Sequence, residues 1–285
     1  MCNEGRHTDP DHIARDAGIV DGNQEFAALS QAVADLARAA CKPSAGERMT
    51  HAVGLLVKFY AHASSAFHLS GGTVVPTSPE RKLDLTSVLV LCRAAYETFF
   101  RFHHVFVEPD TPEGRECMYL GWKLASYRGR QKYPATLRSS QQLKVDEQVI
   151  IDQIKQELVQ NTHYQALSKS ERKQLKQRGQ TKSWGDIALS AGLVGIHADH
   201  LYRYLCGPAH SGWIDVGQFA TKGRSAAAED IRLALEAIMI AMAFILDAFV
   251  KVFPAHESIL APEQVRIIDA WKDIGSRLRP TETTR

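Results

Sequence analysis

An arginine and a histidine seven positions apart are the residues of this chain best suited to chemistry. Arg203 and His210 stand in the run LYRYLCGPAHSGW, residues 201–213. A guanidinium stays charged and presents a planar fork of donors to phosphate oxygens. An imidazole titrates near neutral pH, so it can take a proton from a nucleophile or give one to a leaving group. The pair has the groups needed to cleave RNA without a metal ion, by attack of the 2′-hydroxyl on its own phosphate.

A helix break is predicted between these two residues. The apolar spacing of residues 195–206 is that of a helix, and Gly207 followed by Pro208 is typical of a helix end. We therefore expect Arg203 in the last turn and His210 just past it, both facing one polar hollow. An isolated pair of this kind more often serves structure, with the arginine on a core carboxylate and the histidine capping the loop.

Arg93 and Glu97 form a second polar constellation. They are spaced i,i+4 on a predicted helix that is apolar almost all round, so we expect a buried ion pair. One interpretation is purely structural. The other places Glu97 beside His210 as a catalytic partner that fixes the imidazole tautomer. In that interpretation the supporting residues are Arg93, Tyr204 and His200.

Residues 169–182, KSERKQLKQRGQTK, are basic with a single acid, Glu171. Such runs are mostly solvated faces or linkers. This one can also follow a phosphate backbone. Its predicted nucleic-acid-binding residues are Lys173, Lys176, Arg178 and Lys182.

Other functional signatures are few. His197 and His200 lie three apart, but no third ligand is evident, so no metal site is predicted. Nucleophile-elbow, dinucleotide and phosphate-loop motifs are absent, and no cofactor is predicted. Residues 184–206 also scan as a helix-turn-helix with Gly192 in the turn, which makes DNA binding an alternative.

Apolar spacing of three and four recurs along the chain and predicts an all-α, multi-helix bundle with two long buried core helices. The predicted helices cover residues 24–41, 46–70, 80–107, 112–133, 143–161, 168–178, 184–191, 195–206, 226–253 and 262–278. We expect a single domain over residues 21–279, with its basic segment exposed. Residues 1–20 and 280–285 are predicted to be loose.

Composition limits the class of protein. The 285 residues are 45% hydrophobic with a net charge of +2, which suits a globular chain. Five scattered cysteines without a CxxC motif favour reduced thiols and a cytoplasmic location. The most apolar run, residues 237–246, is too short for the ~20 residues of a membrane span, so we expect a core helix and no membrane partner.

The run RYLCGPAH resembles the R-x4-6-H signature of the HEPN superfamily, with six residues between Arg203 and His210. Residues 50–250 also resemble a group of uncharacterised bacterial helical proteins with an R-x3-E helix. The HEPN resemblance implies a helical bundle, a homodimer whose two motifs form one cleft, and a metal-independent RNase. It implies that Arg203 binds phosphate and His210 is catalytic. In this chain Tyr204 stands where a small polar residue is common.

These observations lead to one functional hypothesis and two alternatives. The hypothesis is a metal-independent endoribonuclease of HEPN type, serving as a toxin or anti-phage defence effector. Its expected partners are RNA, a second copy of the chain and a regulatory or inhibitory protein. The alternatives are a non-catalytic helical binding module and the DNA-binding protein.

Overall fold

The all-α fold predicted from apolar spacing is confirmed. A computed structural model describes residues 22–42, 45–74, 81–194, 198, 200–210, 217, 221 and 223–277. Within these ranges the elements are helices, except for an antiparallel hairpin of two short strands, β1 (Thr73–Val74) and β2 (Arg81–Lys82). The predicted loose ends lie outside the described residues.

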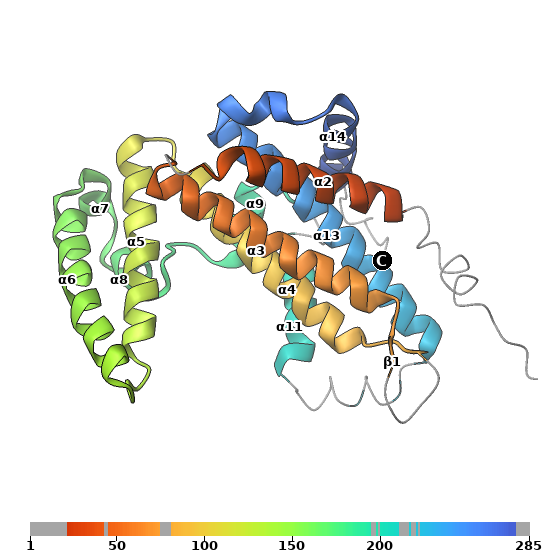
Figure 1. Ribbon diagram of the computed structural model, residues 1–285, viewed down its shortest axis with the longest axis horizontal. Coiled ribbons are helices and arrows are strands. Elements are labelled where there is room, and N and C mark those ends of the chain that lie inside the picture. Colours follow the sequence, from red (N-terminus) through yellow and green to blue (C-terminus); the bar gives the residue numbers. More distant parts are fainter. Residues whose placement is uncertain are drawn as a thin grey trace, which may run out of the picture. The chain divides into compact units, whose positions relative to one another are not determined.

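The chain divides into two compact units, one made of residues 1–99 and 192–285 and the other of residues 100–191. A single domain over residues 21–279 stays a prediction. The elements of the first unit are α2 (Gly22–Ala40), α3 (Glu47–Ser70), the hairpin, most of α4 (Leu85–Phe102), α11 (Leu201–His210), α13 (Arg224–Val252), the 3-10 helix η2 (Pro254–Ile259) and α14 (Pro262–Arg277) (Figure 1).

Helix α13 forms the centre of the first unit because it is apolar on nearly every side. No residue of the run 237–246 is more than 7% exposed, and α2, α3 and α14 all contact this helix. Ser225–Val252 is long and apolar enough to cross a membrane, but 78% of its most apolar window is buried inside the molecule. Burial on all sides is what such a composition predicts for a core helix.

Two side chains tie α4 to α13. The Tyr96 hydroxyl donates to the carbonyl of Ala237 at 3.0 Å, and the Cys92 thiol donates to that of Ala234 at 3.8 Å. Burial raises the pKa of both groups. A hydroxyl buried in an apolar core needs such a partner, so these bonds fix which face of α4 meets the core.

Helix α5 (Pro112–Gln131) is the centre of the second unit. The helices α6 (Arg138–Gln160), α7 (Thr162–Ala166) and α8 (Lys169–Arg178) belong to the same unit, and α6, α7 and α8 all contact α5 (Figure 1). Their shared apolar core is formed by Cys117, Met118, Leu120, Leu124, Ile151, Ile154, Leu158, Tyr164 and Leu175.

The second unit also holds a π-helix, η1 (His103–Val107), and the short helix α9 (Trp184–Ser190). Sequence spacing predicted one helix over residues 80–107, and the structure ends α4 at Phe102 and continues as η1. Helix α6 begins five residues before its predicted start at residue 143. The sequence did not predict α7, because five residues hold too little of the apolar period to be recognised.

Candidate functional site

The helix that carries Arg203 does not break at Gly207 and Pro208. Helix α11 continues through both residues to His210, so the predicted break is wrong. Proline takes a helical φ and forfeits the hydrogen bond that its missing N–H would make. Buried Leu201 and Leu205 anchor the helix. Such packing outweighs the low helix propensity of the Gly-Pro pair.

Arg203 and His210 consequently share one side of a continuous helix. Seven residues at the ideal helical step return to within about 20° of the starting direction and advance ~10 Å along the axis. The Arg203 side chain is exposed, while the side chain of His210 lies outside the described residues. The two residues are therefore placed together by helical periodicity, not by a loop after a break.

Glu97 of α4 is bound to α11 through a tyrosine. Its Oε1 accepts from Arg93 Nε at 2.9 Å and from the Tyr202 hydroxyl at 2.8 Å. The guanidinium carbon of Arg93 also lies 6.0 Å from the centroid of the Tyr202 ring. These three side chains form a network that holds α11 against α4 next to Arg203.

Within this network the pKa values of Tyr202 and Arg93 are both raised. Burial and the hydrogen bond to Glu97 raise the pKa of the Tyr202 hydroxyl, so it remains a donor. Burial disfavours the charge of Arg93, but the Glu97 carboxylate outweighs this and raises the pKa of Arg93. The carboxylate therefore accepts two hydrogen bonds, one of them from a charged donor.

The i,i+4 ion pair of Arg93 and Glu97 was predicted, but its burial was not correct. The side chains are 24% and 36% exposed. The neighbouring positions Cys92 and Tyr96 face α13, which turns the polar stripe by about 100° toward α11 and the surface. Tyr202 was missed because its partner lies 105 positions earlier in the chain, where local spacing carries no signal.

The other predicted residues near Arg203 are on the surface. Tyr204 is 42% exposed, and His200 is exposed in the turn before α11. Their supporting roles, and the expected contact between Glu97 and His210, stay predictions. The structure adds a hydrogen bond that the Tyr202 hydroxyl donates to Glu97.

The four predicted nucleic-acid-binding residues differ in their surroundings. Lys173 and Arg178 are exposed and Lys176 is half-buried on α8, and none of the three forms an ion pair among the described residues. Lys182 lies past the helix, and its ammonium pairs with Glu108. Its charge is therefore already neutralised within the protein.

The Glu108 carboxylate also contacts a buried histidine. His104 Nδ1 lies 2.5 Å from Glu108 Oε2, and His104 Nε2 accepts from the Thr181 N–H at 3.3 Å. Both ring nitrogens are thus engaged, with the proton on Nδ1. Both His103 and His104 are buried, with exposed fractions of 8% and 2%. We assign a structural role to this cluster, because its contacts hold residues 181–182 against η1.

The DNA-binding alternative rests on α9 and the helix after it. Helix α9 forms as predicted and Gly192 turns with φ +90°, a conformation that favours glycine. The second helix is described from Leu201, and His197 lies outside the described residues. Helices α9 and α11 belong to different compact units. The helix-turn-helix stays a prediction.

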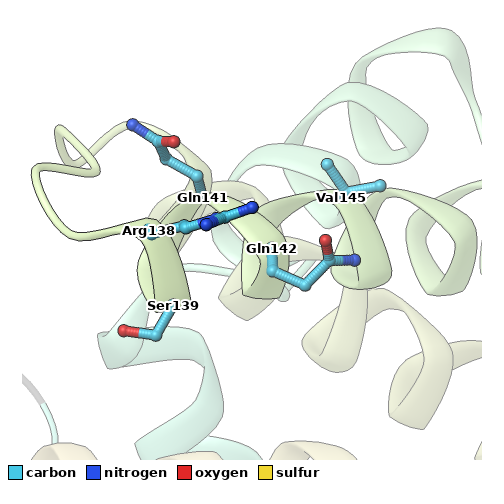
Figure 2. A pocket seen from close by; sticks show the side chains of 5 residues that line it. All are labelled: Arg138, Ser139, Gln141, Gln142 and Val145. Carbon is cyan, nitrogen blue, oxygen red and sulfur yellow. The ribbon is translucent and has the colours of Figure 1, made fainter.

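Two further features of the structure concern ligand binding. In the described ranges, no group of three His, Cys, Asp or Glu side chains is placed to hold a metal ion. Figure 2 shows a surface hollow in the first turns of α6, lined by Arg138, Ser139, Gln141, Gln142 and Val145. It contains one cation but no carboxylate, histidine or thiol, so it has no acid or base for catalysis.

No family model, no curated protein and no solved structure matches this chain.

Proposed function

We propose that this chain is a metal-independent endoribonuclease whose reacting phosphodiester binds along α11. The observation that supports the proposal most is that Arg203 and His210 lie two turns apart on one side of a continuous helix, with Arg203 exposed. A nucleotide that lies along this side can present its phosphate to one residue and its ribose to the other. The resemblance to HEPN proteins supports the same assignment.

The proposed reaction is an internal transfer that needs no metal or cofactor. The 2′-oxygen attacks the adjacent phosphorus while His210 removes the 2′-proton. The bond from phosphorus to the 5′-oxygen breaks, and the imidazolium returns a proton to that leaving oxygen. The products are a 2′,3′-cyclic phosphate and a 5′-hydroxyl. Arg203 donates to the non-bridging oxygens, whose charge grows in the transition state.

The network beneath α11 positions the helix. Glu97 and Arg93 act through Tyr202, which precedes Arg203 by one residue. Because a misplacement of about 1 Å can cost about 100-fold in rate, this attachment of α11 to α4 serves catalysis as well as folding. In the proposed homodimer, the α11 helices of two copies face a common cleft.

Cleavage with chelator present tests the proposal. Purified protein is incubated with total RNA and EDTA, and the new ends are analysed for 2′,3′-cyclic phosphate. Arg203→Ala and His210→Ala should each lower the rate by about 100-fold or more. Arg266→Ala is the matched control, since this exposed arginine on α14 pairs with Glu263 on the same helix. Circular dichroism is used to check that each variant is folded.

Other outcomes are equally informative. Intact RNA at high protein concentration contradicts the nuclease and leaves the binding module. Duplex DNA binding with steep salt dependence, lost in Arg203→Ala, favours the DNA-binding alternative instead.

A further inference from the structure

The second unit holds an uneven share of the positive charge. Residues 100–191 contain fifteen Lys or Arg and ten Asp or Glu, a net charge of +5, whereas the whole chain has +2. The remainder is therefore net acidic. Any attraction for a polyanion is concentrated in this unit.

Four cations of this unit gather on one side of α8. Leu175 is fully buried and marks the inward direction of the helix. Counted from Leu175 at the ideal step, Arg172, Lys176, Lys169 and Lys173 lie at about 60°, 100°, 120° and 160°. We call these four residues the basic stripe. Lys169 and Lys173 are exposed, and Arg172 and Lys176 are half-buried.

The stripe is not neutralised by carboxylates. None of its members forms an ion pair among the described residues, and Arg172 instead lies over the Tyr164 ring at 5.8 Å. The one acid of α8, Glu171, lies on the other flank of the helix. Its carboxylate accepts from the Ser168 N–H at 2.8 Å in a capping box. Cations left unpaired on one face keep their full attraction for an external anion.

Helix α8 holds this stripe on a fixed platform. Arg101 donates to the carbonyls of Gly179 and Arg178, and Arg128 of α5 donates to that of Lys176 at 3.3 Å. These bonds satisfy carbonyls that the end of a helix leaves open. They also bring the exposed Arg128 beside the stripe.

We propose that the basic stripe of α8, extended by Arg128, binds the phosphate backbone of RNA. The inference rests on the proposed function for the identity of the ligand. It assigns binding to one face of α8, whereas the sequence pattern indicated only the segment 169–182. Lys169 to Lys176 span ~10 Å along the helix, about three nucleotides at the rise of a helical strand. Arg178 lies at about 300°, on the other flank, and Lys182 is paired with Glu108. Neither residue belongs to the proposed RNA-binding surface.

The test measures RNA binding apart from RNA cleavage. A short fluorescent RNA with 2′-O-methyl groups has no 2′-hydroxyl to react, and its dissociation constant is measured across salt concentrations. With three to five phosphate contacts, log Kd should change with log salt by a slope of about 2 to 3.5. Lys169→Ala with Lys173→Ala should lower the slope by about 1.4 and weaken binding on the order of 20-fold at ~0.1 M salt.

Arg178→Ala is the matched control, because it removes a charge from the same helix but from the other flank. It should change the affinity by no more than about twofold at ~0.1 M salt. Alanine keeps helix propensity, so all variants should remain folded. An equal loss per removed charge in Arg178→Ala and in the doubly substituted stripe variant would overturn the inference, since only net charge would matter.

The two proposals fail separately in this design. Stripe-dependent binding without any cleavage of natural RNA contradicts the nuclease and upholds the stripe. Cleavage of natural RNA, together with binding that the stripe substitutions leave unchanged, upholds the nuclease and contradicts the stripe. Binding to phosphatidylserine vesicles in place of RNA overturns the stripe's assignment.

Discussion

The hydroxyl of Tyr202 donates to Glu97 Oε1 at 2.8 Å, and this bond attaches α11 to α4. Arg93 donates to the same oxygen at 2.9 Å. Arg203 and His210, the two residues proposed for catalysis, therefore stand on a helix that a polar network holds in place.

Removal of this hydroxyl should weaken the protein modestly. Tyr202→Phe keeps the ring but loses the bond to Glu97, so the free energy of unfolding should fall by about 1 kcal/mol. Urea unfolding followed by circular dichroism measures the change. Tyr204→Phe is the control, because the described contacts give that exposed hydroxyl no hydrogen bond. Equal midpoints for Tyr202→Phe and the wild type would contradict the prediction.

The second unit should lose stability in acid because of Glu108. Hydrogen bonds from His104 and Lys182 outweigh burial and lower the pKa of Glu108 from 4.5 to about 2. A carboxylate with a lowered folded pKa stabilises the fold above its unfolded pKa, and this is lost as pH falls from 4.5 toward 2. The contribution is on the order of 3 kcal/mol.

Glu108→Gln tests this pH dependence. The variant should be less stable than the wild type at neutral pH, and its stability should vary less below pH 4.5. Glu157→Gln, on an exposed position of α6, should keep the wild-type profile. Burial also lowers the pKa of His103 to about 4, although the Glu108 carboxylate acts to raise it, so the wild type should show a separate loss as pH falls from 6.5 to 4, and the variant should show a loss at least as large. If the stability of Glu108→Gln depended on pH as that of the wild type does, the prediction would be contradicted.

The platform of the basic stripe depends on close contact between α5 and α8. A Cβ added at Gly121 would overlap the Leu175 side chain, with even its Cδ2 only 2.9 Å away. Gly121→Ala should therefore lower the free energy of unfolding by about 1–3 kcal/mol. Gly129→Ala, on the same helix with open space around it, should instead raise it by up to about 1 kcal/mol. Thermal unfolding of the two variants should give opposite shifts.

Continuity of α11 through Pro208 is directly testable. Pro208→Ala restores an N–H that can donate to the Tyr204 carbonyl, so stability should rise by about 1–3 kcal/mol. Pro262→Ala is the control, because a proline in the first position of α14 costs no hydrogen bond. A loss of stability in Pro208→Ala would show that the helix ends before this residue.

The sequence by itself determined the fold class and most of the helices. Apolar residues that recur every three or four positions identify a helix locally, and the run at 237–246 identified the core helix for the same reason. The ion pair of Arg93 and Glu97 was also predictable, because i,i+4 residues are neighbours on any helix.

Only the tertiary structure decided what these helices touch. The bond from Tyr202 to Glu97 and the pairing of Lys182 with Glu108 join residues far apart in the chain. Leu201 and Leu205 are buried, and the helix that carries them continues past Gly207 and Pro208. Burial of Leu175 likewise selected the outward face of α8. Local spacing reports the period of a helix, while the direction in which each face points is set by its neighbours in space.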